Sequence, residues 1–202
     1  MKNMSLKELE EKLRSNEFQN TENDIFYNFF IYLYDPADEY KMRAQIREFK
    51  QNLLRPVDYV DVLTIDIFEE LCNFLNNQPY GNFNSSLLQY LLEKDKDDHE
   101  AVLRLLTGKA NCSEFYKYLD KHIKEHISIS DDKKRPYVFL YGLGKIFPYM
   151  RISTLLANYE QYNKSSRYKI IVFYPGNKEG NNYRLFNILE DHHTYRATLM
   201  NG

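Results

Sequence analysis

The stretch Tyr168-Lys-Ile-Ile-Val-Phe-Tyr-Pro-Gly176 decides the fold of this chain. Its centre, Ile170 to Tyr174, is continuously apolar, and the Pro-Gly pair that follows predicts the end of a strand. Such a run is typical of a strand covered on both faces, as in a parallel sheet between two layers of helices. We therefore predict a buried strand over Tyr168–Tyr174.

Further apolar runs predict the rest of the sheet. They are Ile25–Tyr34, Val60–Ile67 and Tyr137–Tyr141, with Tyr195–Met200 as a candidate fifth strand at the edge. Helical periodicity lies between them, over about 5–15, 36–55, 68–75 and 151–162. Alternating strands and helices predict an α/β fold, a three-layer (αβα) sandwich around a mostly parallel sheet of four to five strands. We expect Val60–Ile67, Tyr137–Tyr141 and Ile170–Tyr174 to be central. A longer helical pattern predicts a helical insertion at about 84–127.

Length and composition indicate a single α/β domain over residues 1–202. The chain is 43% hydrophobic with only seven Gly and six Pro, which excludes a disordered class. Its N-terminus carries no secretory signal, and its longest apolar run is about half of the ~20 residues that a membrane helix needs. Cys72 and Cys112 lie far apart and are typical of buried free thiols in a reducing compartment. We expect a cytoplasmic protein without a membrane segment.

The net charge of −2 conceals an uneven distribution. Residues 133–196 hold eleven Lys and Arg against four Asp and Glu, a balance of +7, and residues 1–132 have a balance of −9. This pattern either steers an anionic ligand or an oppositely charged protein, or reflects two solvated faces. Direct DNA binding is the least favoured function, because the whole chain is slightly acidic.

Ligands of open α/β sheets usually bind outside the carboxyl ends of the strands. Four of the predicted strand ends carry residues that could contact a ligand or turn the chain tightly. We regard them as a candidate ligand or interaction pocket: Asp35, Asp66, Gly142, Gly144, Lys145, Arg151, Pro175, Gly176 and Arg184. The glycines would let a backbone approach a ligand, and the three cations could form a basic pocket of phosphate size.

The same residues have a structural interpretation. Gly142-Leu143-Gly144-Lys145 lacks the spacing and the Ser or Thr of a nucleotide P-loop, and Pro148 predicts that no helix starts directly after the glycines. The glycines then only turn the chain. Arg151 and Arg184 would cluster with the Pro175-Gly176 turn and clamp loops by binding backbone carbonyls or the carboxylates of Asp66 or Asp35.

No complete catalytic or metal-binding motif is present. His122 and His126 are one helical turn apart but lack a third ligand, so they are interpreted as surface histidines. His192-His193 could do acid–base chemistry, yet no nucleophile sits in a recognisable motif beside it. Lys133-Lys134-Arg135 is typical of a solvated turn. We predict no catalytic residue, no metal and no cofactor.

Several motifs, in order along nearly the whole chain, resemble the BrxB family of bacteriophage-exclusion (BREX) systems. They are Tyr32-Leu33-Tyr34-Asp35-Pro36 with Asp38-Glu39, Leu63-Thr64-Ile65-Asp66-Ile67-Phe68, Gly142-Leu143-Gly144, Phe147-Pro148-Tyr149-Met150-Arg151, Thr154-Leu155-Leu156, Tyr174-Pro175-Gly176, Arg184-Leu185-Phe186 and Tyr195-Arg196-Ala197. The sequence departs from the family pattern after Arg151, where Ile152 and Ser153 replace a Ser-His pair.

The resemblance implies an accessory component of a multi-protein phage-defence system, with no assigned enzyme activity. It implies other BREX proteins as partners, above all PglZ, which resembles alkaline phosphatases. If the missing His served chemistry in the family, its absence argues against catalysis here. The leading hypothesis is therefore a non-catalytic interaction module. The alternative is a nucleotide- or phosphate-binding protein with a pocket at the strand ends.

Overall fold

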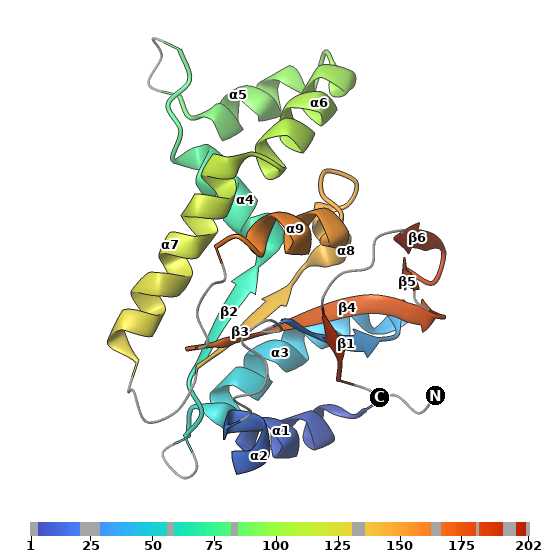
Figure 1. Ribbon diagram of the computed structural model, residues 1–202. Coiled ribbons are helices and arrows are strands. Elements are labelled where there is room, and N and C mark those ends of the chain that lie inside the picture. Colours follow the sequence, from blue (N-terminus) through green and yellow to red (C-terminus); the bar gives the residue numbers. More distant parts are fainter. Residues whose placement is uncertain are drawn as a thin grey trace.

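A computed structural model describes residues 4–20, 29–55, 59–81, 85–130, 136–162, 167–180, 182–191 and 197–200. It is an α/β fold in which helices cover both faces of a mostly parallel sheet (Figure 1). The elements are α1 (Leu6–Arg14), α2 (Asn16–Asn20), β1 (Phe29–Tyr34), η1 (Pro36–Asp38), α3 (Glu39–Leu53), β2 (Val62–Asp66), α4 (Ile67–Asn76), α5 (Leu87–Lys94), α6 (His99–Ala110), α7 (Ser113–Ile129), β3 (Tyr137–Tyr141), α8 (Leu143–Ile146), α9 (Ile152–Tyr159), β4 (Lys169–Glu179), β5 (Asn182–Leu185), β6 (Leu189–Asp191) and β7 (Thr198–Leu199).

The parallel part of the sheet has the strand order β2-β3-β4-β1-β7. β4 lies in the middle and pairs with β3 on one side and β1 on the other, which confirms the prediction for Ile170–Tyr174. β3 is interior too, and the expected strand in the tail pairs with β1 at the edge. The prediction that Val60–Ile67 is central is wrong, because β2 is the other edge strand. Its apolar character comes from α3 and α4, which both pack on it, so composition alone does not distinguish it from a central strand.

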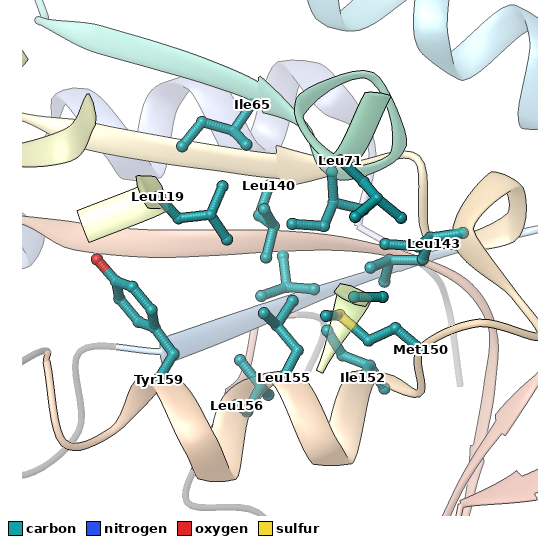
Figure 2. Close-up of a cluster of buried hydrophobic side chains, with 14 of the residues drawn as sticks. Ile65, Leu71, Leu119, Leu140, Leu143, Met150, Ile152, Leu155, Leu156 and Tyr159 are labelled. Carbon is teal, nitrogen blue, oxygen red and sulfur yellow. The ribbon is translucent and has the colours of Figure 1, made fainter. Parts of the chain in front are cut away.

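Alternating side chains of each strand enter two separate hydrophobic clusters. On β4, Ile170, Val172 and Tyr174 face the cluster that the helices α4–α9 cover. Ile171 and Phe173 face the cluster under α1 and α3. Figure 2 shows the first cluster, where side chains of the sheet meet those of α7 and α9. The two clusters are the two interfaces of a three-layer sandwich.

The predicted helical insertion is present as α5, α6 and α7. The long helix α7 packs on α4, where the Phe74 and Phe115 rings lie 5.3 Å apart and the Tyr118 hydroxyl donates to Glu70 at 2.9 Å. Helices α5 and α6 extend away from the sheet (Figure 1). Among the helices in the described ranges, none combines the length and apolar character that crossing a membrane requires. Cys72 and Cys112 are free, but both are partly exposed and not buried as predicted.

The prediction that Pro175-Gly176 ends the fourth strand is wrong. β4 continues to Glu179 and turns back as the antiparallel strands β5 and β6. Gly176 is required in this hairpin because a Cβ there would lie 2.0 Å from the carbonyl oxygen of Arg184. The antiparallel pairing of β4 with β5 begins at Gly176, directly after Pro175, the last residue that pairs with β1.

Some predictions fall outside the described residues. They concern the first part of the Ile25–Tyr34 run, Lys133-Lys134-Arg135, His192-His193 and Tyr195-Arg196.

Candidate functional site

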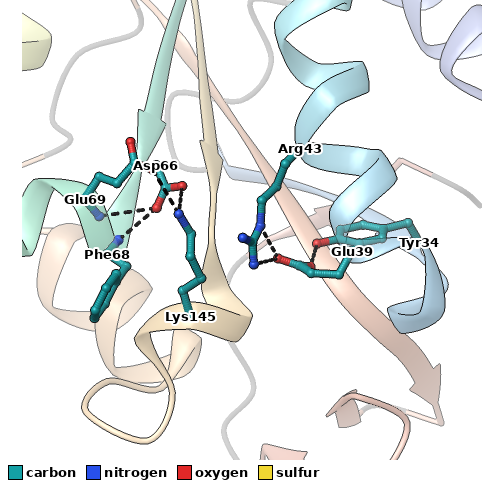
Figure 3. Close-up of polar contacts among 7 residues, drawn as sticks. All are labelled: Tyr34, Glu39, Arg43, Asp66, Phe68, Glu69 and Lys145. Carbon is teal, nitrogen blue, oxygen red and sulfur yellow. Dashed lines mark hydrogen bonds and ion pairs between the residues drawn. The ribbon is translucent and has the colours of Figure 1, made fainter.

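The first polar cluster at the carboxyl end of the sheet is centred on Asp66. This buried residue ends β2 and caps α4, where its carboxylate accepts from the backbone N–H groups of Phe68 at 3.2 Å and Glu69 at 3.3 Å. The Lys145 ammonium binds the same carboxylate and lies 3.1 Å from the Glu69 side chain (Figure 3). Burial lowers the pKa of Lys145, but its bonds to the two carboxylates outweigh this and raise the pKa above its ordinary value. Lys145 is therefore a charged, internally paired residue.

Gly142 makes room for this cluster. Its φ is +81°, and a Cβ at this position would lie 2.4 Å from Asp66 Oδ1. Only glycine combines the left-handed backbone with so close an approach to a buried carboxylate. The requirement is structural in origin, since the group that approaches Gly142 is a side chain of the same protein.

The segment after β3 does not have the form of a phosphate loop. The prediction that Pro148 delays the helix is wrong, because α8 starts at Leu143 directly after Gly142 and ends at Ile146, before the proline. The backbone N–H groups of Lys145 and Ile146 both donate to the Gly142 carbonyl, at 3.0 and 3.2 Å. These N–H groups are bonded within the turn and do not point to an open anion site.

A second cluster lies at the end of β1 and was missed from the sequence. The buried carboxylate of Glu39 accepts from the Tyr34 hydroxyl and from Arg43 Nε at 3.0 Å (Figure 3). Burial, together with the Glu39 charge, raises the pKa of Tyr34 far above its ordinary value. The sequence signals were the i, i+4 spacing of Glu39 and Arg43 and the presence of Tyr34 and Glu39 in the first motif quoted for the family resemblance. Asp35 does not join this cluster; it is exposed and caps η1 through Ala37 N at 2.9 Å.

Arg151 and Arg184 are linked through the β5–β6 hairpin. Arg151 Nη1 donates to the Glu190 carbonyl at 3.0 Å, and Glu190 pairs with Arg184 across the hairpin. Arg184 itself binds the Glu179 carboxylate at 2.6 Å. Neither arginine binds Asp35 or Asp66, so that part of the expected clamp is wrong, because Lys145 already neutralises Asp66. Lys145, Arg151 and Arg184 thus each bind a different acceptor.

A pocket opens beside Arg151, between the α8–α9 segment and the hairpin. The enclosed room is about 20 Å³, which is on the order of one water molecule. Its lining is mostly aliphatic: Leu143, Ile146, Phe147, Met150, Arg151, Ile152, Leu155, Tyr174, Leu185, Leu189 and Asp191. Figure 2 shows Leu143, Met150, Ile152 and Leu155 of this lining as members of the first hydrophobic cluster. Among the predicted site residues, Arg151 alone lines it.

The polar groups at this pocket are arranged around the start of α9. Asp191, which is buried, accepts the backbone N–H of Ser153 at 3.2 Å through Oδ2. The hydroxyl of Tyr174 is fully buried and has no hydrogen-bond partner among the described residues. Burial, together with the nearby Asp191 charge, raises the pKa of Tyr174 above its ordinary value. The lining therefore includes one buried, neutral phenol and one exposed guanidinium.

The histidines of α7 have separate carboxylate partners. His122 Nδ1 lies 3.4 Å from Glu70, and His126 Nε2 lies 3.0 Å from Asp61. Within the described ranges, no three side chains of His, Cys, Asp or Glu are grouped as a metal site would require.

The sequence of the chain is similar to that of known proteins. A family model described as BREX protein BrxB matches residues 63–200. The chain is similar to the BREX protein BrxB of Bacillus cereus (strain H3081.97), with 25% identity over 169 residues that cover 84% of this chain and 81% of that protein. No solved structure is significantly similar to the chain.

Proposed function

The chain belongs to the BrxB family of BREX proteins, and from this premise we propose that it is a non-catalytic interaction component of a phage-defence complex. It acts in the cytoplasm as one α/β domain over residues 1–202. Its partners are other BREX proteins, most directly the alkaline-phosphatase-like PglZ. It needs neither a metal nor a cofactor for this role.

The observation that carries the proposal is the internal pairing of the charges at the strand ends. Lys145 is bound to Asp66 and Glu69, and Arg184 is bound to Glu179. A phosphate site needs several donors that converge on one point and are left uncompensated by the protein. Cations already neutralised by carboxylates contribute to the fold and not to the binding of an anion.

A second candidate function is supported by one residue. Among the described residues, the exposed Arg151 makes one hydrogen bond, to the Glu190 carbonyl, although a guanidinium has five N–H donors. It lies at the mouth of the pocket. The alternative is therefore a nucleotide- or phosphate-binding protein that holds its anion on Arg151.

Affinity purification from cells that carry the whole operon tests the leading proposal. We expect tagged protein to recover PglZ or another BREX protein in stoichiometric amount, and nuclease treatment should leave the recovery unchanged. If no BREX protein is recovered above an untagged control, the proposal fails.

A second assay separates the two functions. We expect the purified protein to hydrolyse neither ATP nor a generic phosphodiester above the buffer rate. Robust hydrolysis that Arg151→Ala or Lys145→Ala abolishes would overturn the proposal and favour the alternative.

A further inference from the structure

We propose that the pocket between α8–α9 and the β5–β6 hairpin binds one buried water molecule, which bridges the Tyr174 hydroxyl, the Asp191 carboxylate and the Ser153 hydroxyl. The inference assigns a solvent-binding site to this part of the fold. It is independent of the proposed function, because it concerns how the chain satisfies its own buried polar groups and not which partner the chain binds.

The size of the pocket suits a single water molecule. Its enclosed room is about 20 Å³. A buried water occupies roughly 10–15 Å³ of such room and needs about two to four polar partners. A nucleotide, an amino-acid side chain or a hydrated ion is larger than this space, so water is the ligand that the size of the pocket selects.

Two hydroxyl groups at this place are buried and make no hydrogen bond to a described residue. They belong to Tyr174 of β4, which is 0% exposed, and to Ser153 of α9, which is 1% exposed. A buried polar group without a hydrogen bond is costly, so nearly all such groups in folded proteins bind protein atoms or ordered water. Each of these hydroxyls can donate to a water or accept from it.

Asp191 links the two hydroxyls to the pocket. Its Oδ2 accepts from the Ser153 backbone N–H at 3.2 Å, and Asp191 and Tyr174 both line the pocket. Burial and the Asp191 charge both raise the pKa of Tyr174, so the phenol lies within electrostatic range of that carboxylate. A carboxylate has about four acceptor positions, so Asp191 can accept from a water as well as from the backbone.

A dry cavity and a bound cation fit these groups less well. Cavities that stay empty are lined by apolar groups alone, whereas Tyr174 and Asp191 contribute polar groups to this wall. A cation would lie near the guanidinium of Arg151, which lines the same pocket and would repel it. Water accepts from a hydroxyl and donates to a carboxylate, so it satisfies both kinds of group at once.

The bridging water joins three elements that are far apart in the sequence. Tyr174 belongs to β4, Asp191 ends β6, and Ser153 lies in the first turn of α9. The hydrogen bond from Arg151 to the Glu190 carbonyl joins the same hairpin to the start of the same helix. The water therefore adds to the contacts that fasten the hairpin to α9 beside Arg151.

The site contributes little to the free energy of unfolding. A hydrogen bond to water is nearly as favourable as a direct one, but immobilising the water offsets part of that gain. Removing the Tyr174 hydroxyl alone therefore leaves the stability close to that of the native protein. The presence of the water itself is the sharper measurement.

A high-resolution crystal structure of the native protein tests the inference. We expect one density peak in the pocket, roughly 2.6–3.2 Å from Tyr174 Oη, from Ser153 Oγ and from an oxygen of Asp191. A pocket without density would overturn the inference, as would a direct hydrogen bond between the Tyr174 hydroxyl and either of the other two side chains. A peak that gains anomalous signal after a rubidium soak would also overturn it, because that peak is a cation.

Oxygen-17 magnetic relaxation dispersion, which counts long-lived buried waters in solution, supplies the second measurement. We expect the double variant Tyr174→Phe/Ser153→Ala to lose one such water, because Asp191 alone remains to hold it. Tyr32→Phe is the matched control and should keep the native count, since the Tyr32 hydroxyl donates to the Met4 carbonyl at 2.7 Å. Circular dichroism verifies that both variants fold. An unchanged count in the folded double variant would overturn the inference.

Discussion

Lys145 of α8 binds the carboxylate of Asp66, so the segment that follows β3 is fastened to the end of the edge strand β2. Asp66 and Tyr141 are paired at the ends of the same two strands. The ion pair therefore extends the β2–β3 ladder by one further contact beyond the last strand residue. It links an exposed edge to the interior of the sheet.

This pair makes a prediction for stability. We expect Lys145→Ala to lower the free energy of unfolding by about 2 kcal/mol, because it leaves a buried carboxylate without its cation. The loss stays below the ~3–5 kcal/mol of a fully buried pair, since Asp66 keeps two backbone donors. Urea denaturation measures it. Lys96→Ala is the matched control, because its pair with Glu93 is exposed on both sides and should matter little. Equal stability of the two variants would contradict the assignment.

Substitutions at three glycines separate the effect of the close contact at Gly142 on stability from the effect of its backbone conformation. Gly142 and Gly180 both have positive φ, but a Cβ at Gly180 would meet nothing within 4 Å. We expect Gly180→Ala to cost about 1 kcal/mol and Gly142→Ala about 3 kcal/mol, because the latter also displaces Asp66. Gly108 lies in the last turn of α6, and a Cβ there would meet nothing within 4 Å, so Gly108→Ala should raise the free energy of unfolding by ~0.5–1 kcal/mol. Thermal unfolding of the three variants measures this order, and Gly142→Ala no worse than Gly180→Ala would refute the contact.

Strand positions and hairpins show where sequence reasoning succeeded and failed. The run Ile170–Tyr174 was predictable because both faces of β4 are buried. The edge position of β2 was not, because α3 and α4 give it the composition of an interior strand. The β5–β6 hairpin was missed because its strands are short and polar, and its turn uses Phe186 and Asn187 in place of glycine.

The sequence indicated which residues belong to the site, but it did not indicate which of them contact one another. Asp66, Gly142 and Lys145 stood out as residues at strand ends, and the sequence could not indicate that the three contact one another. Arg151 was expected to bind either backbone carbonyls or the carboxylate of Asp66 or Asp35, and it binds the Glu190 carbonyl, which belongs to a hairpin that the sequence did not predict. Partners that lie far apart in sequence depend on topology, which apolar patterns do not encode.

The free energy of unfolding is expected to depend on pH through Asp61, which joins the start of β2 to the end of α7. Burial alone would raise the pKa of Asp61, but hydrogen bonds from His126 and Ser130 lower it below its ordinary value. Because its pKa is lower in the folded state, the ionised carboxylate stabilises the fold. This contribution is fully present above the unfolded-state pKa of about 3.9 and is lost as the pH falls through the folded-state pKa.

Unfolding free energies of the native protein and of Asp61→Asn, measured from pH 6 to pH 2, test this. The native protein should lose stability more steeply below about pH 4 than Asp61→Asn does. Asp97→Asn, at an exposed position, should retain the native slope. Parallel slopes for the native protein and Asp61→Asn would show that Asp61 does not contribute the dependence.

Two buried tyrosines provide the last prediction, which compares a hydrogen-bonded hydroxyl with one that has no partner among the described residues. The Tyr32 hydroxyl donates to the Met4 carbonyl at 2.7 Å. The Tyr174 hydroxyl is buried without a partner among the described residues. A buried hydroxyl without a hydrogen bond costs stability, whereas one that is bonded contributes about 1 kcal/mol.

We therefore expect Tyr32→Phe to lower the free energy of unfolding by ~1 kcal/mol and Tyr174→Phe to leave it equal or raise it by ~0.5–1 kcal/mol. Both are measured by urea denaturation of the isolated protein. If Tyr174→Phe destabilised the isolated protein as much as Tyr32→Phe, the Tyr174 hydroxyl would be hydrogen-bonded within the fold.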